Sequence, residues 1–282
     1  MRFMNTPGAM LPMIQQATAS PALGAPSAVC LAGLPALRTR AFRPGHAAPH
    51  FNPVTGELIE GFAIHAAHDL LQRRAARALT ARRYAQRGYQ CSEVAPEVER
   101  HLLTLRAEAD QKIVGTMGIR SDSEHGLAAD LVFPDEVAAM REAGRSLCEF
   151  TQLALDENEA PSKHVLAALF HTAYIHAHHV NGAEWLVIEV NPRHVAYYRR
   201  MLGFRVCAEA RPNPRVQAPA VLMTLDFSYV EEQVETYGGR PELIGQTRSL
   251  YPYFYSPEEE SAILERMRDG ASLQSAAGRQ PS

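Results

Sequence analysis

The chain has 282 residues, of which 46% are hydrophobic and 21% charged, and its formal net charge at pH 7 is -3. This length allows one large domain with extensions or two small domains, with an ordinary packed core. The near-neutral charge gives no overall electrostatic reason to bind nucleic acid or an anionic membrane surface, and no stretch approaches the roughly 20 apolar residues that a transmembrane helix needs.

The first 55 residues are dominated by Ala, Pro, Gly, Ser and Thr without helical or strand periodicity, so we predict a flexible leader. Because Arg38, Arg40 and Arg43 are unopposed by acids, a targeting presequence is the alternative. The start of the chain makes a poor secretory signal. The four cysteines show no CxxC spacing, which favours free thiols in a reducing cytoplasm over a zinc site or redox pair.

After this leader, residues 62–84 predict an amphipathic basic helix, with Leu70, Leu71, Ala75, Ala78 and Leu79 on its apolar side. Residues 101–107 and 112–119 alternate around a turn and predict an antiparallel hairpin. The elements expected next are helix 134–143, strand 146–155, helix 163–180, strand 185–190, helix 192–202 and strands 204–209 and 220–228. This order predicts a mixed α/β sheet with right-handed crossovers.

Two features mark helix ends in the second half of the chain. Asn191 and Pro192 suit the cap and first position of a helix that Gly203 ends. After Val230, Ser256 and Pro257 begin a short helix expected over 256–268, with disorder after Asp269. The aromatic run before it, YPYFY at 251–255, is too apolar for a free linker and should pack on the main domain.

Three segments carry a family resemblance: the strand at 147–155, the segment VNPRH to YYRRMLGF at 190–204, and YPYFYSPEEE at 251–260. Over about residues 60–268 the chain resembles the long-chain N-acyl amino acid synthases of the GNAT superfamily, relatives of the acyl-homoserine-lactone synthases. The resemblance implies a mixed, mostly antiparallel sheet with two splayed parallel strands, flanked by helices. It divides the chain into a leader (1–55), the acyltransferase domain (56–230) and a C-terminal extension (231–282).

The resemblance also implies a reaction. A long-chain acyl group would pass from an acyl carrier protein to the α-amine of an amino acid, with tyrosine as one candidate, by direct attack and without a bound metal or cofactor. Backbone N–H groups of Leu153 and Ala154, on a bulged strand, would stabilise the oxyanion. A bacterial, cytoplasmic enzyme is implied, with no nucleic-acid partner, and its lipid product would bring it into peripheral contact with membranes.

The donor expectation depends on one loop. Acetyl-CoA enzymes of this superfamily carry a glycine-rich loop that holds the pyrophosphate at a helix N-terminus. The corresponding DENEAPSK at 156–163 has no glycine and three acids, which disfavours coenzyme A. The phosphopantetheine arm of a carrier protein needs no such cradle, so acyl-CoA is the less favoured donor.

Two carboxylates are candidates for proton transfer. The EFTQL at 149–153 resembles the Glu-x-x-Arg pattern of autoinducer synthases, with Gln152 in place of arginine, which argues against a homoserine-lactone product. Glu149 would bind or deprotonate the amine, or else form a structural salt bridge. Glu189, inside an apolar strand, is either a second proton acceptor or the partner of a helix arginine.

The helix at 192–202 is expected to hold the acyl donor. Many GNATs place a proton-donating tyrosine four residues before the helix-ending glycine, where this chain has Arg199. The residues expected on the donor side are Lys163, Arg193, Tyr197, Arg199 and Arg200, and the alternative for each is a solvated surface position.

Five histidines at 164, 171, 176, 178 and 179 lie on one predicted helix without the i, i+4 pairs typical of metal sites, so a polar helix face is expected. Two other functions remain open: a generic GNAT acetylating an amine from acetyl-CoA, and a non-catalytic acyl-binding module.

Overall fold

The computed structural model describes residues 62–89, 102–156 and 162–277. The predicted leader and most of the 156–163 loop therefore lie outside the described residues. The strands are β1 (Ala63–Ala66), β2 (Leu102–Ala109), β3 (Lys112–Ser121), β4 (Leu147–Leu155), β5 (Trp185–Val190), β6 (Arg205–Asn213) and β7 (Ala218–Asp226). The α-helices are α1 (Leu70–Gln86), α2 (Pro134–Glu142), α3 (Ser162–Tyr174), α4 (Val195–Leu202), α5 (Phe227–Tyr237), α6 (Ile244–Thr247) and α7 (Pro257–Ala277).

Short helical segments complete the elements of the described residues: η2 (Ala128–Leu131), η3 (Ile175–Val180), η4 (Pro192–His194), η5 (Pro241–Leu243) and η6 (Tyr251–Tyr253). The strands form one sheet in the order β1-β2-β3-β4-β5-β7-β6. Each neighbouring pair is antiparallel except β4 and β5, which run parallel and are joined through α3. The predicted mostly antiparallel sheet with one parallel pair is confirmed.

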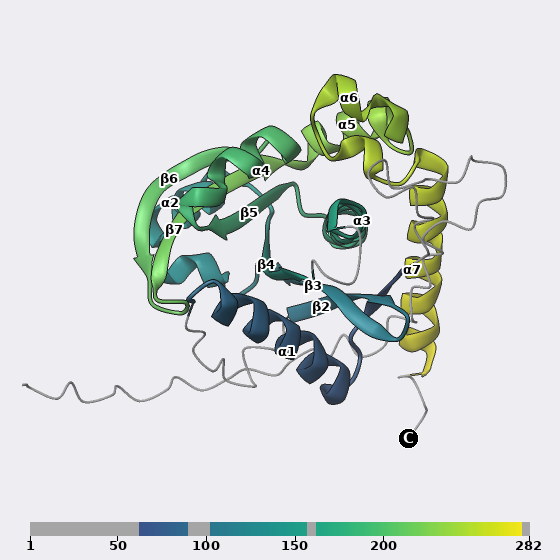
Figure 1. Cartoon of the computed structure of the whole chain (residues 1–282), viewed down its shortest axis with the longest axis horizontal. Coiled ribbons are helices and arrows are strands. Elements are labelled where there is room, and N and C mark those ends of the chain that lie inside the picture. Colours follow the sequence, from purple (N-terminus) through teal and green to yellow (C-terminus); the bar gives the residue numbers. More distant parts are fainter. Residues whose placement is uncertain (1–61, 90–101, 157–161, 278–282) are drawn as a thin grey trace, which may run out of the picture.

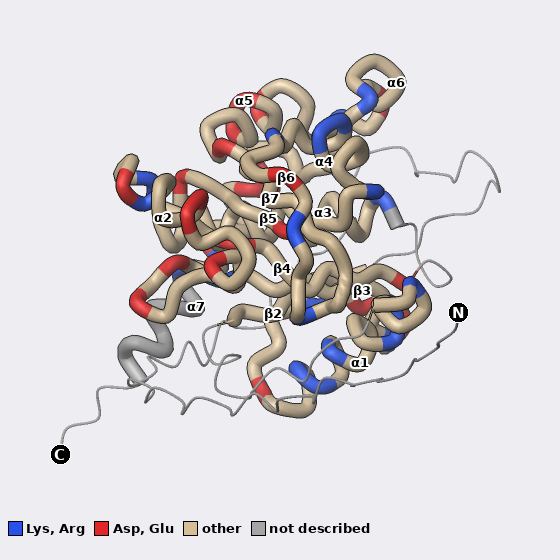
Figure 2. Tube along the Cα trace, turned by 90° about the vertical axis from the view of Figure 1, so that its left-hand side faces the viewer, with Lys and Arg blue, Asp and Glu red and all other residues tan. Residues whose placement is uncertain are grey.

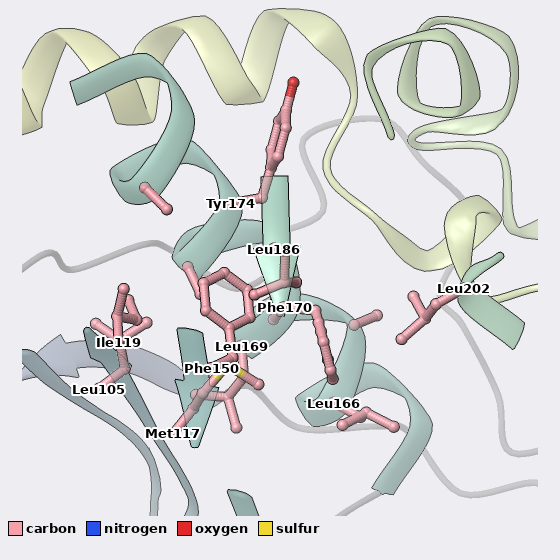
Figure 3. Close-up of a cluster of buried hydrophobic side chains, with 14 of the residues drawn as sticks. Leu105, Met117, Ile119, Phe150, Leu166, Leu169, Phe170, Tyr174, Leu186 and Leu202 are labelled. Atoms are coloured by element: carbon pink, nitrogen blue, oxygen red, sulfur yellow. The ribbon is translucent and has the colours of Figure 1, made fainter. Parts of the chain in front are cut away.

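Helices cover both faces of the sheet. Figure 1 shows α1 and α3 on opposite sides of β2, β3 and β4, with α7 standing along the edge of the molecule. The larger core lies on the α3 side, where Phe150 of β4 and Phe170 of α3 have ring centroids 6.0 Å apart. Figure 3 shows these two rings in the core together with Leu202 of α4. A second, smaller core lies under α2 and includes Val187 of β5.

The start of the described chain corrects one prediction. Residues 63–66, predicted to be helical, form β1 because they pair with β2, and the helix begins only after Asp69, whose carboxylate accepts from the N–H of Gln72 at 2.8 Å. The predicted apolar side of this helix is also wrong. Leu70 and Leu71 are 57% and 75% exposed, whereas α1 buries a face that includes Leu79.

The ends of the helical segment that η4 and α4 form together, predicted as one helix over 192–202, follow from its sequence. The side chain of Asn191 accepts from the N–H of Arg193 at 3.2 Å, as a capping residue does. Gly203 ends α4 with φ 82°, and a Cβ there would lie 2.4 Å from the Tyr229 ring. Both predicted ends of this helix are confirmed.

The C-terminal segment packs on the domain and differs from prediction in length. The Tyr251 hydroxyl donates to the Leu202 carbonyl at 2.7 Å, so the aromatic run does contact the main domain. Ser256 caps α7 as predicted, but the helix extends to Ala277, well past the predicted end. Helix α5 was not predicted and begins at Phe227, where a strand was expected to continue.

Within the described ranges, none of the helices has the length and apolar character that a membrane crossing requires.

Candidate active site

The two parallel strands separate part-way along their length. β4 pairs with β5 only through Leu147–Trp185, Cys148–Leu186 and Glu149–Val187. Beyond Glu149 the strands carry no further paired residues, although β4 continues to Leu155 and β5 to Val190. This opening is the splay predicted for the sheet, and it places Glu149 where the strands diverge.

A β-bulge lies in β4 just past this point. Thr116 of β3 faces Ala154 while Gly118 faces Thr151, so one residue of β3 opposes two of β4. Gln152 takes up the extra length in the left-handed region at φ 53°, where residues other than glycine are uncommon. The predicted bulge is therefore present. Leu153 and Ala154, whose N–H groups were predicted to stabilise the oxyanion, are the residues that follow Gln152.

Glu149 is buried and held by the backbone. Its side chain is 1% exposed and accepts a 2.6 Å hydrogen bond from the N–H of Ala128 at the start of η2. Burial raises the pKa of this carboxyl, and the charges of Arg215 and Arg120 act in the opposite direction. A carboxyl with a raised pKa can accept a proton from an amine, as a general base does.

Glu189 lies on the same face of the sheet as Glu149, since it comes two positions after Val187 on β5. Its two oxygens accept separate hydrogen bonds, one from Asn213 at 3.1 Å and the other from Arg215. The predicted helix-arginine partner is thus wrong: the arginine comes from the turn between β6 and β7.

Neither Arg215 nor Asn213 was singled out by sequence. The available signal was Glu189 itself, because a carboxylate within an apolar strand requires a partner. The identity of that partner depends on which hairpin lies beside β5. Arg120, which faces Glu149 across β3 and β4, also escaped notice.

The C-terminal part of α1 connects the ends of the two diverging strands. Arg82 donates to Asp156, directly after β4, at 2.7 Å. Directly after β5, Arg193 donates to the Tyr89 hydroxyl at 2.6 Å and lies over the Tyr89 ring. The end of α1 and Tyr89, which follows it, therefore contact residues that come after each of the two diverging strands.

The residues predicted on the donor side lie on three elements: Lys163 at the start of α3, Arg193 on η4, and Tyr197, Arg199 and Arg200 on α4. Tyr197 is 38% exposed, and Arg199, Arg200 and Lys163 are exposed as well. Figure 2 shows basic residues along α1 and near α4, and α1 carries no acidic residue. The structure brings Arg193 to the opening between β4 and β5. Among the described residues, no contact joins Arg199, Arg200 or Lys163 to this opening.

Tyr198 occupies a different position from its neighbour. It is partly buried between Phe170 and Phe204, with ring centroids 6.3 and 5.7 Å away, and burial raises the pKa of its hydroxyl. It lies in the larger core, whereas strand alternation directs Glu149 to the opposite face from Phe150.

The expected polar histidine face is wrong. His171 and His176 are buried, and the Nε2 atoms of His171 and His179 contact the two oxygens of Glu260 on α7 at 3.0 and 2.7 Å. These histidines therefore attach α7 to the α3 and η3 segment. Among the residues that the structure covers, no group of three or more His, Cys, Asp or Glu is arranged to hold a metal ion.

A small apolar void lies in the larger core, beside the opening. Phe150, Phe170 and Leu186 line it together with Tyr251 and Phe254 of the C-terminal segment. Its volume of about 10 Å³ is at the lower limit for a single water molecule and far too small for an acyl chain. A long acyl chain would enter this region only if side chains moved.

Comparison with known proteins identifies the family. The family model for the N-acyl amino acid synthase FeeM matches residues 75–226, which is more than half of the chain. The chain belongs to the FeeM family. The solved structure of FeeM, an N-acyl amino acid synthase from uncultured soil microbes, is 26% identical with a TM-score of 0.53, covering 60% of this chain and 92% of FeeM.

More distant structures also match. ElaA of Escherichia coli is 11% identical with a TM-score of 0.44, covering 60% of this chain and all of that one (100%). The CoA-dependent acyl-homoserine lactone synthase BjaI is 12% identical with a TM-score of 0.42, covering 59% and 83%. A search of curated proteins found no match. Membership of the FeeM family makes the protein an acyltransferase with a GNAT-like fold, and the predicted resemblance is confirmed.

Proposed function

We propose that this FeeM-family enzyme transfers a long-chain acyl group from an acyl carrier protein to the α-amine of an amino acid. The observation that carries the proposal is the position of Glu149, buried where β4 and β5 separate and just before the bulge at Gln152. A thioester lying in the opening would have a base on one side and strand N–H groups on the other.

The proposed chemistry needs no covalent enzyme intermediate. Glu149 accepts a proton from the ammonium group, and the resulting amine attacks the thioester carbonyl carbon. N–H groups of Leu153 and Ala154 stabilise the oxyanion of the tetrahedral intermediate. The C–S bond then breaks, the amide C–N bond remains, and the thiolate takes the second proton lost by the nitrogen. In this scheme Glu189 positions Arg215 and is not itself a base.

The carrier-protein part of the proposal is supported by charge. The loop at 156–163 has three acids and no glycine, which disfavours a pyrophosphate. We assign the carrier's phosphopantetheine arm to Arg193 at the opening and to Tyr197, and the exposed Lys163, Arg199 and Arg200 to the surface that the carrier protein contacts. Acyl carrier proteins are bacterial cytoplasmic partners, so we place the reaction in that compartment.

The experiment supplies the purified protein with an amino-acid mixture and one of three donors: palmitoyl-loaded acyl carrier protein, palmitoyl-CoA or acetyl-CoA. Mass spectrometry of the products should show N-palmitoyl amino acid, formed faster from the carrier-protein donor. Tight coenzyme A binding with acetylated product would instead support a generic acetyltransferase. Bound lipid without turnover, seen by native mass spectrometry, would support a non-catalytic acyl-binding module.

A further inference from the structure

The turn between β6 and β7 directs one arginine towards the sheet. The N–H of Arg215 donates to the side chain of Asn213 at 3.0 Å, which fixes the turn locally. Asn213 is itself 4% exposed and donates to Glu189. Because Arg215 also donates to Glu189, its guanidinium is held over β5 on the face that carries Glu149.

The guanidinium has donor capacity left after this contact. A guanidinium carries five N–H donors, and Arg215 uses Nη2 on Glu189. Its Nε atom is buried and has no hydrogen-bond partner among the described residues. A buried donor of this kind costs stability unless something accepts from it. Arginine often binds one carboxylate through two parallel hydrogen bonds, and Nε and an Nη nitrogen can donate them from one side of the guanidinium.

Charge balance indicates which ligand suits this place. The cluster contains two carboxylates, Glu149 and Glu189, and two guanidiniums, Arg120 and Arg215, so it is neutral as a whole. Glu149 and Glu189 lie on the same face of the sheet and Arg215 contacts Glu189, so the two carboxylates and Arg215 belong to one cluster. Burial lowers the pKa of Arg215, and the charge of Glu149 acts in the opposite direction. A zwitterion would enter without adding net charge, whereas a simple amine would bring an uncompensated buried cation.

We propose that Arg215 binds the α-carboxylate of the acceptor amino acid while Glu149 faces its ammonium group. This inference rests on the proposed function and assigns the acceptor specificity to the β6–β7 turn. Glu189 is a positioning residue in this arrangement, because it holds the guanidinium and contacts no substrate. The competing explanation is that Arg215 and Glu189 form an ion pair that only stabilises the hairpin.

The test measures kcat/KM with palmitoyl-loaded carrier protein for an amino acid and for its carboxamide, which keeps the amine but lacks the carboxylate. L-Tyrosine and L-tyrosinamide form the first pair, and the other amino acids with their amides are scanned if tyrosine is not used. We expect the wild type to prefer the acid by about 100-fold, because a site built for a carboxylate leaves buried donors unpaired with the amide.

Arg215→Gln should lower kcat/KM for the acid by about 100-fold and change the value for the amide by less than about threefold, so the preference disappears. Arg215→Lys keeps the positive charge but lacks the planar guanidinium that makes two parallel hydrogen bonds, so the preference for the acid should fall about tenfold. This variant provides the test if Arg215→Gln does not fold. The matched control is Arg211→Gln on the same hairpin, whose partner is Glu136; it should leave the preference unchanged.

Equal losses for acid and amide in the Arg215 variants would overturn the inference and support the hairpin-stabilising role. A wild type that acylates both equally would overturn it while leaving the proposed function intact. A wild type that acylates neither, with any amino acid or amide, would refute both.

Discussion

Glu149 of β4 and Val187 of β5 are the last pair of the parallel ladder, and beyond them the two strands no longer pair. This one relationship places a buried carboxyl at the point where a thioester would enter the sheet. The two faces of the sheet belong to different cores at this point. Val187 packs in the smaller core, and Phe150, next to Glu149, packs in the larger one.

Replacing Glu149 tests the base directly. Glu149→Gln should lower kcat by about 100-fold or more, because the general base is lost while the Ala128 N–H still finds an acceptor. In the wild type, activity should fall as pH decreases through the raised pKa of Glu149, since the protonated carboxyl cannot accept a proton. A pH–rate profile measures this limb, which should be absent in the residual activity of the variant. Glu235→Gln, on the exposed side of α5, is the control.

The role of the donor-side arginines Arg199 and Arg200 can be tested independently of the acceptor site. The double variant Arg199→Gln, Arg200→Gln should raise KM for palmitoyl-loaded carrier protein by about tenfold and leave KM for the amino acid unchanged, through loss of charge attraction. Raising the salt concentration should reduce the difference. Arg266→Gln on α7 is the control, also exposed. Equal changes in both KM values would contradict the assignment.

Gly203 and Gly182 provide a matched pair. Both have left-handed φ angles, 82° and 72°, but a Cβ at Gly203 would meet the Tyr229 ring whereas nothing lies within 4 Å at Gly182. Gly182→Ala should cost about 1 kcal/mol of unfolding free energy for conformational strain alone, and Gly203→Ala about 2–3 kcal/mol. Urea unfolding measures both. Equal costs would show that the contact with Tyr229 relaxes freely.

His176 should make stability depend on pH. Burial lowers the pKa of this imidazole from 6.5 to about 4. The unfolded chain therefore binds a proton that the folded protein does not, so stability is full above pH 6.5 and falls as pH decreases towards 4. The expected loss is about 3 kcal/mol over that range. Urea unfolding of His176→Gln should show a shallower dependence, and an unchanged slope would contradict the prediction.

Glu260 should hold α7 in place. Although burial opposes it, hydrogen bonds from His171 and His179 lower the pKa of Glu260 to about 2. Glu260→Gln should weaken the attachment by about 2 kcal/mol, seen as faster amide exchange in α7. Glu265→Gln, an exposed position on the same helix, should leave the exchange unchanged.

Much of the fold follows from local sequence. The strand at Trp185–Val190, the Asn191 cap and the glycine that ends α4 are all specified by neighbouring residues, because capping and backbone conformation act over a few positions. The same holds for the β2–β3 hairpin and for the capping residue of α7. Glu149 could be selected because a carboxyl in a buried strand and a family motif coincide there.

Only the tertiary structure decided what these residues contact. Strand register determined that Glu189 meets Arg215 of a distant turn and that Arg120 faces Glu149. Packing of α7 buried His171, and pairing with β2 converted the start of the predicted helix into β1. A charged residue within an apolar strand pattern indicates that its side chain needs a partner. Which residue becomes the partner depends on the segments that the folded sheet brings side by side. For that reason Arg215, which we propose binds the acceptor, could be selected from the structure and not from the sequence.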